Sequence, residues 1–365
     1  MANRRPLKAA VIGAGWIAEH CHLPGYQKAG VEVAAIAEVV PQRAAEQAKA
    51  FGVARTYTDW RQLLKEERPD IVSVCVPNMF HAEVALGALK AGAHVLCEKP
   101  LATSVAQAAE MFDTARRQGV LLMAGQSQRF RPNNDAIKER VDAGDLGDVY
   151  HAEAVYIRRL GIPTWGTFTR SSYSYGGALC DIGVHSLDLA VWFMGNPRAA
   201  SVSAATERRF GDRPDLGTLR GGWDSTKYVP EDYGALQGVW DATAFDVEDF
   251  ATAFVRFDNG ATLYLEAAWA SHIERRRQYV KLLGTDGGAV TDPPSVYRLK
   301  DGMPLDETIS VPRGTGWEPE VAHFVDAVRG KVPLLVREEE TMNVQRILNA
   351  AYESAALRRE VQISS

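Results

Sequence analysis

The stretch VIGAGWIA at residues 11–18 limits the possible folds of this chain more than any other feature. It follows the apolar run KAAVI (8–12) and opens a segment with a helical pattern. Gly13 permits a tight turn, Gly15 lets a pyrophosphate approach the backbone because it has no Cβ, and Ala18 is small enough for close packing of helix on strand. Strand, glycine turn and helix together predict the first part of a dinucleotide-binding fold.

The first third of the chain alternates short apolar runs with helical patterns. Four more strand-like runs follow the glycine turn, each separated from the next by a helical segment: VEVAAIAE (31–38), DIVSVCVP (70–77), HVLCEKP (94–100) and VLLMAG (120–125). This alternation predicts a parallel sheet with helices on both faces, and the apolar runs fit strands that are buried on both sides. We expect residues 1–125 to form a doubly wound α/β, dinucleotide-binding (Rossmann) domain.

The pattern changes in the rest of the chain. A helical segment, PNNDAIKERVDAG (132–144), precedes several runs in which apolar and polar residues alternate, as in half-buried strands. The Asn-Gly pair at residues 259 and 260 lies between two such runs and predicts a hairpin. We expect residues 126–365 to form a second, α+β domain with a mostly antiparallel sheet. Residues 209–245 are rich in Gly, Asp, Pro and Tyr and look like an insertion or a lid.

Charge and composition favour a cytoplasmic protein without nucleic-acid or membrane partners. The formal net charge is −5 and no long run of one sign is present, so Arg275, Arg276 and Arg277 are interpreted as a solvated strand edge. No segment approaches the roughly 20 apolar residues of a membrane helix, and glycines interrupt the first apolar run, unlike in a signal peptide. The cysteines form no CxxC pair and are expected to stay reduced.

An acid at the end of the second predicted strand indicates which cofactor the glycine turn would hold. Glu38 lies where a carboxylate can accept both hydroxyls of the adenosine ribose and repel a 2′-phosphate. No basic residue follows it before Arg43. The N–H groups of Trp16 and Ile17, at the start of the helix, are expected to face the phosphates. The sequence therefore predicts NAD as the cofactor, with NADP less favoured.

Three stretches carry a resemblance to a known family: GAGWIA (13–18), CVPNMFHAEVALGALKAGAHVLCEKPLA (75–102) and GGALCDIGVHSLDLAVWFMG (176–195). The chain resembles the Gfo/Idh/MocA family of nicotinamide-dependent sugar and cyclitol oxidoreductases over nearly its whole length. EKP after a strand and D-I-G-x-H further on are specific in combination. The resemblance implies a Rossmann domain, a second domain with an open sheet, and a homodimer or homotetramer formed through that sheet.

Lys99, Asp181 and His185 are the candidates for catalysis. Lys99 ends a predicted strand, and open parallel sheets bind ligands at the carboxyl ends of their strands. Asp181 and His185 are four residues apart, so on a helix they share one face. Oxidation of a secondary alcohol needs a base for the proton, a role that suits His185, and a donor to the oxygen, which suits Lys99. Asp181 orients the imidazole or holds a neighbouring hydroxyl; the family assigns these roles to the matching positions.

Each candidate also has an ordinary alternative. An Asp and a His at this spacing are usually a plain helix pair, and a Lys at a strand end is usually solvated. No third ligand or CxxC lies near the pair, so no metal site is expected.

Pro100 cannot continue a strand ladder, and a cis Lys99–Pro100 bond is predicted to aim the ammonium into the cleft.

Further contacts follow from the resemblance. Pro77, Asn78 and His81 are expected along the path from adenosine to nicotinamide, with a helix N-cap as the alternative for Asn78. Glu98 is expected to reach the nicotinamide ribose or to orient Lys99. The expected substrate contacts are the three catalytic candidates together with Gln126, Tyr156, Arg158 and Trp165, although a core Trp and a surface Arg are equally ordinary interpretations. The other histidines are interpreted as structural or surface residues: His20, His22, His94, His151, His272 and His323.

The leading hypothesis is an NAD-dependent dehydrogenase that oxidises a secondary ring hydroxyl of a pyranose sugar, glycoside or cyclitol. One alternative is a glycosidase that uses NAD transiently, through oxidation at C3, elimination, addition of water and re-reduction. Another is a non-catalytic sensor of sugar and NAD on the same fold. The sequence leaves open which sugar reacts, which carbon is oxidised and in which direction the reaction runs.

Overall fold

The computed structural model describes residues 6–163, 166–213 and 242–363, which form two compact units. The first unit comprises Met1–Phe130 and Thr315–Thr341, and the second comprises Arg131–Gly314 and Met342–Ser365. The sequence predicted a single boundary between residues 125 and 126. The structure differs in that the chain returns to the first unit near its end. Most of the insertion expected at 209–245 lies outside the described residues.

The first unit is built on a six-stranded parallel sheet with the order β3-β2-β1-β4-β5-β6. Its strands are β1 (Lys8–Ile12), β2 (Glu32–Ala37), β3 (Arg55–Tyr57), β4 (Ile71–Val74), β5 (His94–Glu98) and β6 (Leu122–Gly125). The doubly wound α/β prediction is confirmed. The sequence missed β3, because three residues are too few to show a period. The strands run in one direction, so their carboxyl ends form a single edge.

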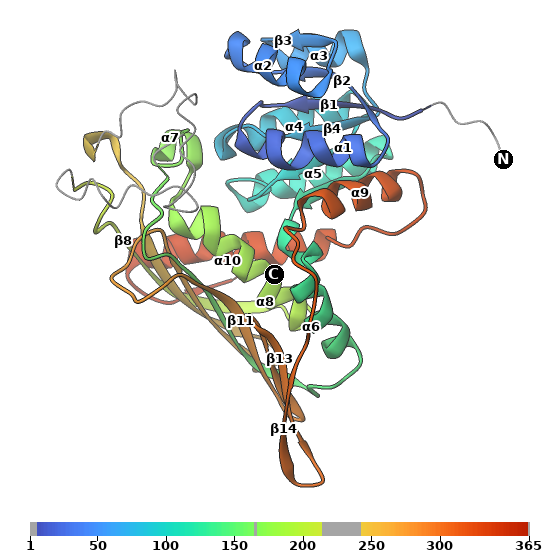
Figure 1. The fold of residues 1–365 in the computed structure, drawn as a ribbon. Coiled ribbons are helices and arrows are strands. Elements are labelled where there is room, and N and C mark those ends of the chain that lie inside the picture. The colour runs from blue at the N-terminus through green and yellow to red at the C-terminus, as the bar shows by residue number, and fades with distance from the viewer. Residues whose placement is uncertain (1–5, 164–165, 214–241, 364–365) are drawn as a thin grey trace. The chain divides into compact units, whose positions relative to one another are not determined.

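Helices cover both faces of this sheet (Figure 1). They are the π-helical η1 (Ala18–His22), α1 (Leu23–Lys28), α2 (Pro41–Phe51), α3 (Trp60–Glu67), the 3₁₀-helical η2 (Asn78–Phe80), α4 (His81–Lys90), α5 (Val105–Gln118), the 3₁₀-helical η3 (Ser127–Phe130) and α9 (Trp317–Val328). Local signals place several ends: the side chain of Ser104 accepts the backbone N–H of Gln107, and Gly119 ends α5 in the left-handed region. Helix α9 packs against α1 and buries Val321 and Phe324.

The second unit contains a nine-stranded sheet with the order β14-β13-β12-β11-β7-β10-β9-β8-β15. Its strands are β7 (Val149–Ile157), β8 (Ala199–Glu207), β9 (Phe250–Phe257), β10 (Thr262–Ala268), β11 (Arg277–Gly284), β12 (Gly287–Thr291), β13 (Pro294–Lys300), β14 (Met303–Thr308) and β15 (Val361–Gln362). Among the described strands of this second sheet, only β7 and β10 pair in parallel. The predicted mostly antiparallel sheet and the Asn-Gly hairpin between β9 and β10 are both confirmed.

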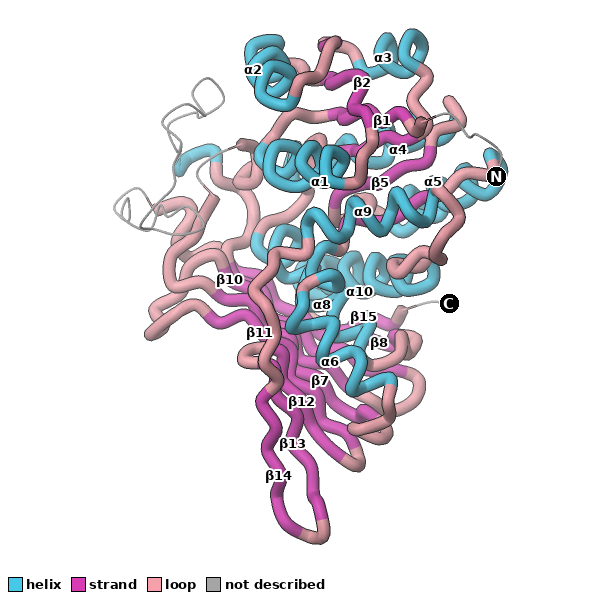
Figure 2. Tube along the Cα trace, turned by 45° about the vertical axis from the view of Figure 1, so that its right-hand side comes forward, coloured by secondary structure: helices cyan, strands magenta, loops and turns pink. Residues whose placement is uncertain are grey.

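Helices α6, α8 and α10 lie on one face of this sheet, and no helix of the described residues covers the other (Figure 2). The helices of the unit are α6 (Pro132–Asp142), α7 (Ser171–Ser174), the π-helical η4 (Leu179–Gly183), α8 (Val184–Phe193) and the 3₁₀-helical η7 (Ala242–Ala244). Helix α10 (Glu338–Leu357) begins in the first unit and continues in the second. None of the described helices is long and apolar enough to cross a membrane.

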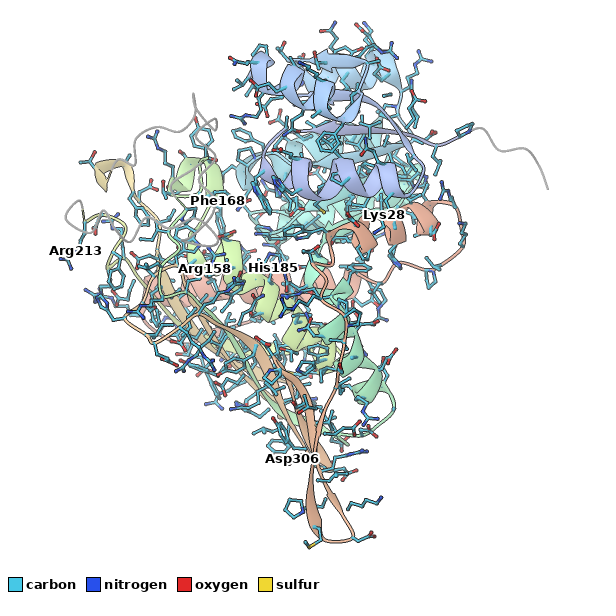
Figure 3. All side chains as sticks on the ribbon, in the orientation of Figure 1. Lys28, Arg158, Phe168, His185, Arg213 and Asp306 are labelled. Atoms are coloured by element: carbon cyan, nitrogen blue, oxygen red, sulfur yellow. The ribbon has the colours of Figure 1, made fainter. Side chains whose placement is uncertain are left out.

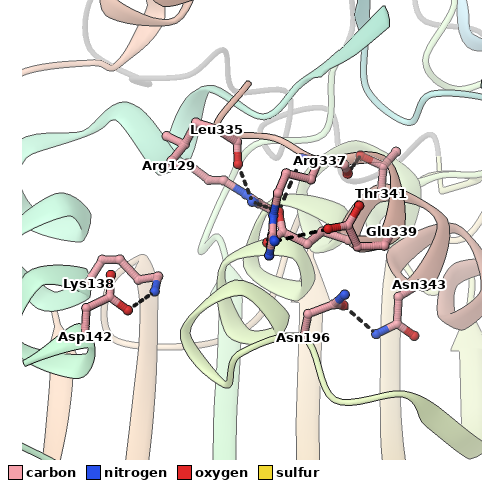
Figure 4. A network of polar contacts seen from close by, with 10 residues as sticks. Arg129, Lys138, Asp142, Asn196, Leu335, Arg337, Glu339, Thr341 and Asn343 are labelled. Carbon is pink, nitrogen blue, oxygen red and sulfur yellow. Dashed lines mark hydrogen bonds and ion pairs between the residues drawn. The ribbon is translucent and has the colours of Figure 1, made fainter. Parts of the chain in front are cut away.

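A buried ion pair fixes the returning segment to the first unit. The Arg129 guanidinium donates to the Leu335 carbonyl, and Arg337 lies beside it (Figure 4). Arg129 also donates to the Glu340 carboxylate, and Arg337 pairs with the other oxygen of the same carboxylate. The side chains of Arg129 and Glu340 are 0% and 3% exposed. Burial alone would raise the pKa of Glu340, but Arg129 and Arg337 outweigh it and hold the pKa below its usual value. The carboxylate therefore stays charged and paired.

Replacing Arg129 with Met should lower the free energy of unfolding by about 3–5 kcal/mol, because Glu340 would keep a buried charge without its main partner. Arg116→Ala is the matched control: its ion pair with Glu338 is exposed and screened by solvent, so its loss should be far smaller than that of Arg129→Met. Urea denaturation of both variants measures the difference. Equal losses in the two variants would contradict the assignment.

Candidate functional site

The glycine turn lies at the carboxyl end of β1 and has the geometry expected of a dinucleotide loop. Gly13 has φ +94°, and a Cβ added there would stand 2.4 Å from the carbonyl oxygen of Cys75. Only glycine fits this position. At Gly15 an added Cβ would meet no atom of the described residues within 4 Å, so the backbone is open to a phosphate. Trp16 and Ile17 begin the helix that follows, as predicted.

Glu38 lies directly after β2 and is held against the same turn. It is 7% exposed; its Oε2 accepts the N–H of Ala14 at 2.9 Å, and its Oε1 accepts the N–H of Val40 at 3.1 Å. The guanidinium of Arg43 lies 3.6 Å from Oε2. The sequence argument counted only the residues between Glu38 and Arg43, whereas the structure brings Arg43 back beside the carboxylate.

Lys99 follows β5 at the carboxyl edge of the parallel sheet, and its side chain is half-buried. The Lys99–Pro100 peptide bond is cis, which confirms the sequence prediction. Glu98, the last residue of β5, is 8% exposed, and its Oε2 accepts the N–H of Lys99 at 3.2 Å. The lysine is therefore attached on its N-terminal side to a residue that is fixed in the core.

A buried chain of polar groups holds Glu98. Its Oε1 lies 3.0 Å from Nε2 of His22; Nδ1 of the same ring lies 2.8 Å from the Ser73 hydroxyl, which in turn contacts Tyr26 at 2.8 Å. Burial alone would raise the pKa of Glu98, but His22 and Lys99 outweigh it and keep the pKa low. The sequence analysis treated His22 as structural or surface; its connection to Glu98 depends on the order of the strands and had no local signal.

His81 holds the residue on the other side of Lys99. Its Nδ1 lies 2.7 Å from the carbonyl oxygen of Pro100, and its Nε2 lies 2.9 Å from that of Val76. The ring is 1% exposed, and burial lowers the pKa of His81 despite both carbonyls. The sequence predicted a cofactor contact for His81. That contact stays a prediction; in the structure the two ring nitrogens face backbone carbonyls, so the residue joins the loop after β4 to the loop after β5.

The remaining predicted residues of the first unit lie at the same edge. Pro77 precedes η2 and Asn78 is the first residue of η2, so Asn78 is not the N-cap of this helix. Gln126 follows β6 and is 3% exposed, and its amide oxygen has no hydrogen-bond partner among the described residues. Gln126 belongs to the first unit, although the sequence analysis assigned it to the second domain.

Asp181 and His185 lie in the second unit, on consecutive turns of one helix. Asp181 belongs to the π-helical η4 and His185 to α8, which continues it; both are half-buried, whereas the residues between them are buried. The Oδ2 of Asp181 accepts the indole N–H of Trp269 at 2.9 Å. Short π-helical turns are frequent at functional sites. The predicted common face of the pair is therefore present, and Trp269 is a contact that the sequence did not reveal.

Glu248 anchors the start of this helix. Its carboxylate accepts the N–H groups of Gly177 and Leu179 at 2.8 and 3.0 Å and the hydroxyl of Tyr352 at 2.8 Å. A Cβ on Gly177 would stand 1.8 Å from the Glu248 carbonyl oxygen, so this position requires glycine. Burial raises the pKa of Glu248 and the three donors oppose the rise. Gly177 thus allows the close approach to Glu248, and Gly176 allows one to Tyr352, whose hydroxyl a Cβ there would meet at 1.9 Å.

Tyr156 and Arg158 come from β7 and the residue that follows its end. They are 3% and 5% exposed, and the Arg158 guanidinium donates to the Gly161 carbonyl and to the Tyr156 hydroxyl. Tyr156 packs in one buried cluster with Ile182 and Trp269, next to Asp181. Trp165, the third predicted sugar contact, lies outside the described residues.

The site residues therefore form two groups. The first unit holds the glycine turn, Glu38 and Lys99 at one sheet edge, and the second holds Asp181 and His185. A carboxylate, an imidazole and an ammonium are groups suited to proton transfer and to stabilising charge on an oxygen. Within the described residues, no cluster of three or more His, Cys, Asp or Glu side chains could hold a metal ion.

Comparison with known proteins gives consistent matches along the chain. Residues 7–126 match an oxidoreductase family with an NAD-binding Rossmann fold, named Gfo/Idh/MocA, and residues 135–290 match a C-terminal domain of the same family. The chain is 34% identical over 362 residues to D-glucoside 3-dehydrogenase of Escherichia coli (strain K12), covering 98% of both chains. It is 29% identical over 268 residues to levoglucosan dehydrogenase of Pseudarthrobacter phenanthrenivorans, covering 70% of this chain and 63% of that protein.

Solved structures share the fold. A levoglucosan dehydrogenase in complex with NADH and levoglucosan superposes with a TM-score of 0.81 at 23% identity, covering 99% of this chain and 100% of that one. An oxidoreductase from Agrobacterium radiobacter in complex with NAD⁺, L-tartaric acid and magnesium gives a TM-score of 0.80 at 20% identity and covers 98% of both chains. At these identities the likeness concerns the fold alone.

Proposed function

The chain belongs to the Gfo/Idh/MocA family of NAD-binding oxidoreductases, and on that premise we propose that it oxidises a secondary ring hydroxyl of a pyranose sugar, glycoside or cyclitol. The observation that carries the proposal is the Asp181–His185 pair, held half-buried by a π-helical turn in one unit, with Lys99 at the carboxyl edge of the sheet in the other. The relative that matches over 98% of its length is named for a reaction of this type.

NAD, when bound, supplies the acceptor for the hydride. The residues at the sheet edge fit this group: Gly13 makes the turn, Gly15 leaves the backbone open, and Glu38 stands where the adenosine ribose would lie. In the proposed reaction the imidazole of His185 takes the hydroxyl proton. The ammonium of Lys99 donates a hydrogen bond to the substrate oxygen as its charge grows. Asp181 orients the imidazole or a neighbouring hydroxyl, and its own position is fixed by Trp269.

We further propose that two buried histidines act as positioning residues for Lys99. His22 holds Glu98, the residue before the lysine, and His81 holds the carbonyl of Pro100, the residue after it. The backbone on both sides of Lys99 is thus fixed from the core. Catalytic groups need such support, because a small displacement of a donor from the reacting atom costs much of its effect.

A homodimer or homotetramer through the second unit's sheet is part of the proposal. Helices cover one face of the sheet (Figure 2). Phe254, Tyr264 and Tyr279 are half-buried and share the other face by strand register, because the buried residues next to them on each strand face the helices. Aromatic side chains on an uncovered sheet face suit contact with a second copy of the chain. Analytical ultracentrifugation of the full chain tests the oligomeric state directly.

Replacing His185 with Ala should lower kcat by roughly 10²–10⁴-fold, because the proton acceptor is lost while the residues around NAD are unchanged. The rate of NADH formation with a panel of glycosides, pyranoses and inositols measures the effect, and the Kd for NAD should stay as in the wild type. His151→Ala, on β7, is the control and should keep kcat. A kcat near the wild-type value in His185→Ala would remove His185 from the mechanism. Net NADH accumulation also separates this reaction from a glycosidase that only borrows the hydride.

The wild type should use NAD at least about tenfold more efficiently than NADP, because Glu38 repels a 2′-phosphate. Glu38→Gln should reduce this preference, since it removes the negative charge and leaves Arg43 free to meet the phosphate. Glu32→Gln, at the exposed start of the same strand, is the control and should not change it. The measurement is kcat/KM for each cofactor. A wild type that favours NADP would refute the role of Glu38.

Two substitutions of His81 should separate its two contacts. Asn carries its amide nitrogen near the place of Nδ1 and retains a donor to Pro100; Gln carries it near the place of Nε2 and retains a donor to Val76. If His81 positions Lys99 through Pro100, His81→Gln should lower kcat by roughly 10–100-fold and His81→Asn should lower it far less. Steady-state kinetics with KM for NAD measured in parallel provide the test. Equal kcat values in the two variants would show that the contact to Pro100 does not matter.

A further inference from the structure

Two arginines of the second unit meet at one phenol. The hydroxyl of Tyr156 accepts hydrogen bonds from Arg158 at 3.3 Å and from Arg276 at 2.9 Å. Each guanidinium carbon also lies 5.1 Å from the centre of the Tyr156 ring. Arg276 precedes β11, which pairs with β7 so that Gln278 stands opposite Tyr156. The guanidiniums of Arg158 and Arg276 therefore donate to the same oxygen, which brings their two positive charges close together.

These charges have no counterion within the described part of the chain. The remaining hydrogen bonds of Arg158 and Arg276 go to neutral acceptors, the Gly161 carbonyl and the Gln278 side chain. The adjacent Arg277, by contrast, pairs with Glu274. Arg158 is only 5% exposed. A buried charge is costly without an opposite charge, so the pair Arg158–Arg276 is suited to receive an anion.

A third arginine adds to the positive field. Burial lowers the pKa of the Arg131 guanidinium, and the charge of Arg276 lowers it further, while Tyr156 and the Asp292 carboxylate act in the opposite direction. Arg131 begins the segment that leads into α6 and so approaches the phenol from a different element. The Arg131 guanidinium therefore lies within the electrostatic reach of both Tyr156 and Arg276.

The polar atoms that remain available in the cluster are donors. The Nε–H of Arg158 is buried and has no partner among the described residues. The Tyr156 oxygen already accepts from two guanidiniums, and its own hydrogen donates to no atom of the described residues. Donors with positive charge and a planar guanidinium fit an oxyanion, which only accepts, better than they fit a sugar hydroxyl.

The cluster adjoins the proposed substrate side of the second unit. Tyr156 shares a buried cluster with Ile182 and Trp269, and Trp269 donates to the Asp181 carboxylate. Figure 3 shows the side chains of Arg158, which follows β7, and of His185, on α8, both in the second unit. Arg276 is exposed, so a group on the substrate can reach the cluster from solvent.

We propose that Tyr156, Arg158 and Arg276 bind an oxyanion of the substrate, so that the preferred sugar or glycoside carries a carboxylate or a phosphate. This inference rests on the proposed function and adds the substrate class. It also changes the interpretation of Arg275, Arg276 and Arg277 as a plain solvated strand edge, because Arg276 turns inward to Tyr156 while its neighbours do not share that contact.

Three glycosides that differ only at C6 test the proposal: methyl β-D-glucopyranoside, its uronate and its 6-phosphate. The wild type should show a kcat/KM for the uronate or the phosphate roughly tenfold or more above that for the neutral glycoside, the size expected for a hydrogen bond to a charged group. Whichever of the two anions shows the larger ratio identifies the anion. Equal values for all three glycosides, or a preference for the neutral one, would overturn the proposal and leave the dehydrogenase assignment intact.

Arg276→Gln and Arg275→Gln form a matched pair, since both side chains are exposed and only Arg276 contacts Tyr156. Arg276→Gln should reduce the ratio of kcat/KM between the charged and the neutral glycoside roughly tenfold, and Arg275→Gln should keep it. An equal reduction in the two variants would show a general effect of surface charge and would refute the site.

A binding measurement keeps the inference separate from the proposed reaction. The shift in Tm on adding each glycoside in the presence of NAD is measured for the wild type and both variants. If no glycoside is oxidised but the charged ones raise Tm in the wild type and Arg275→Gln and not in Arg276→Gln, the anion site stands and the proposed reaction fails. If no charged glycoside raises Tm in the wild type and none is preferred in turnover, the anion site is refuted.

Discussion

The buried carboxylate of Glu98 is the interaction on which the candidate site depends most. It lies at the end of β5, where the parallel sheet presents its carboxyl edge, and must be compensated because it is 8% exposed. His22 supplies the compensation and is itself fixed by Ser73 from the adjacent strand β4. Lys99 directly follows Glu98. Its backbone is therefore held in place by β5, by Ser73 of β4 and by the helical turn η1 that carries His22.

In the second unit, too, a buried carboxylate fixes part of the candidate site, but backbone N–H groups and a hydroxyl compensate it in place of a histidine. Glu248 accepts two backbone N–H groups at the start of η4 and the hydroxyl of Tyr352 from α10, so the helix that carries Asp181 begins at a fixed point. Both His22 and Asp181 lie in short π-helical turns that continue as α-helices. In each unit a polar group of the site is thus connected to a buried carboxylate from a distant part of the sequence.

Many features of the fold and of the candidate site could be predicted from the sequence. The features that could not be predicted depend on contacts between residues that are distant in the sequence. The strands β1, β4 and β5 and the turn at Gly13 have local patterns, because burial on both faces and a tight turn each restrict the residue types. The Asp181–His185 spacing was equally local. The contacts of His22 and His81 were not, because they join residues brought together only by the strand order. The three arginines are exposed at the strand edge as the sequence suggested, but a run of three arginines does not indicate that Arg276 also contacts Tyr156.

The return of residues 315–341 to the first unit has a consequence for synthesis of the chain. Arg129 and the face of α1 that α9 covers are made early, whereas Glu340 leaves the ribosome only after nearly the whole second unit. Domains usually fold in the order in which they emerge. Here the N-terminal sheet must wait, with a bare helix face and an uncompensated guanidinium, until the last part of the chain arrives.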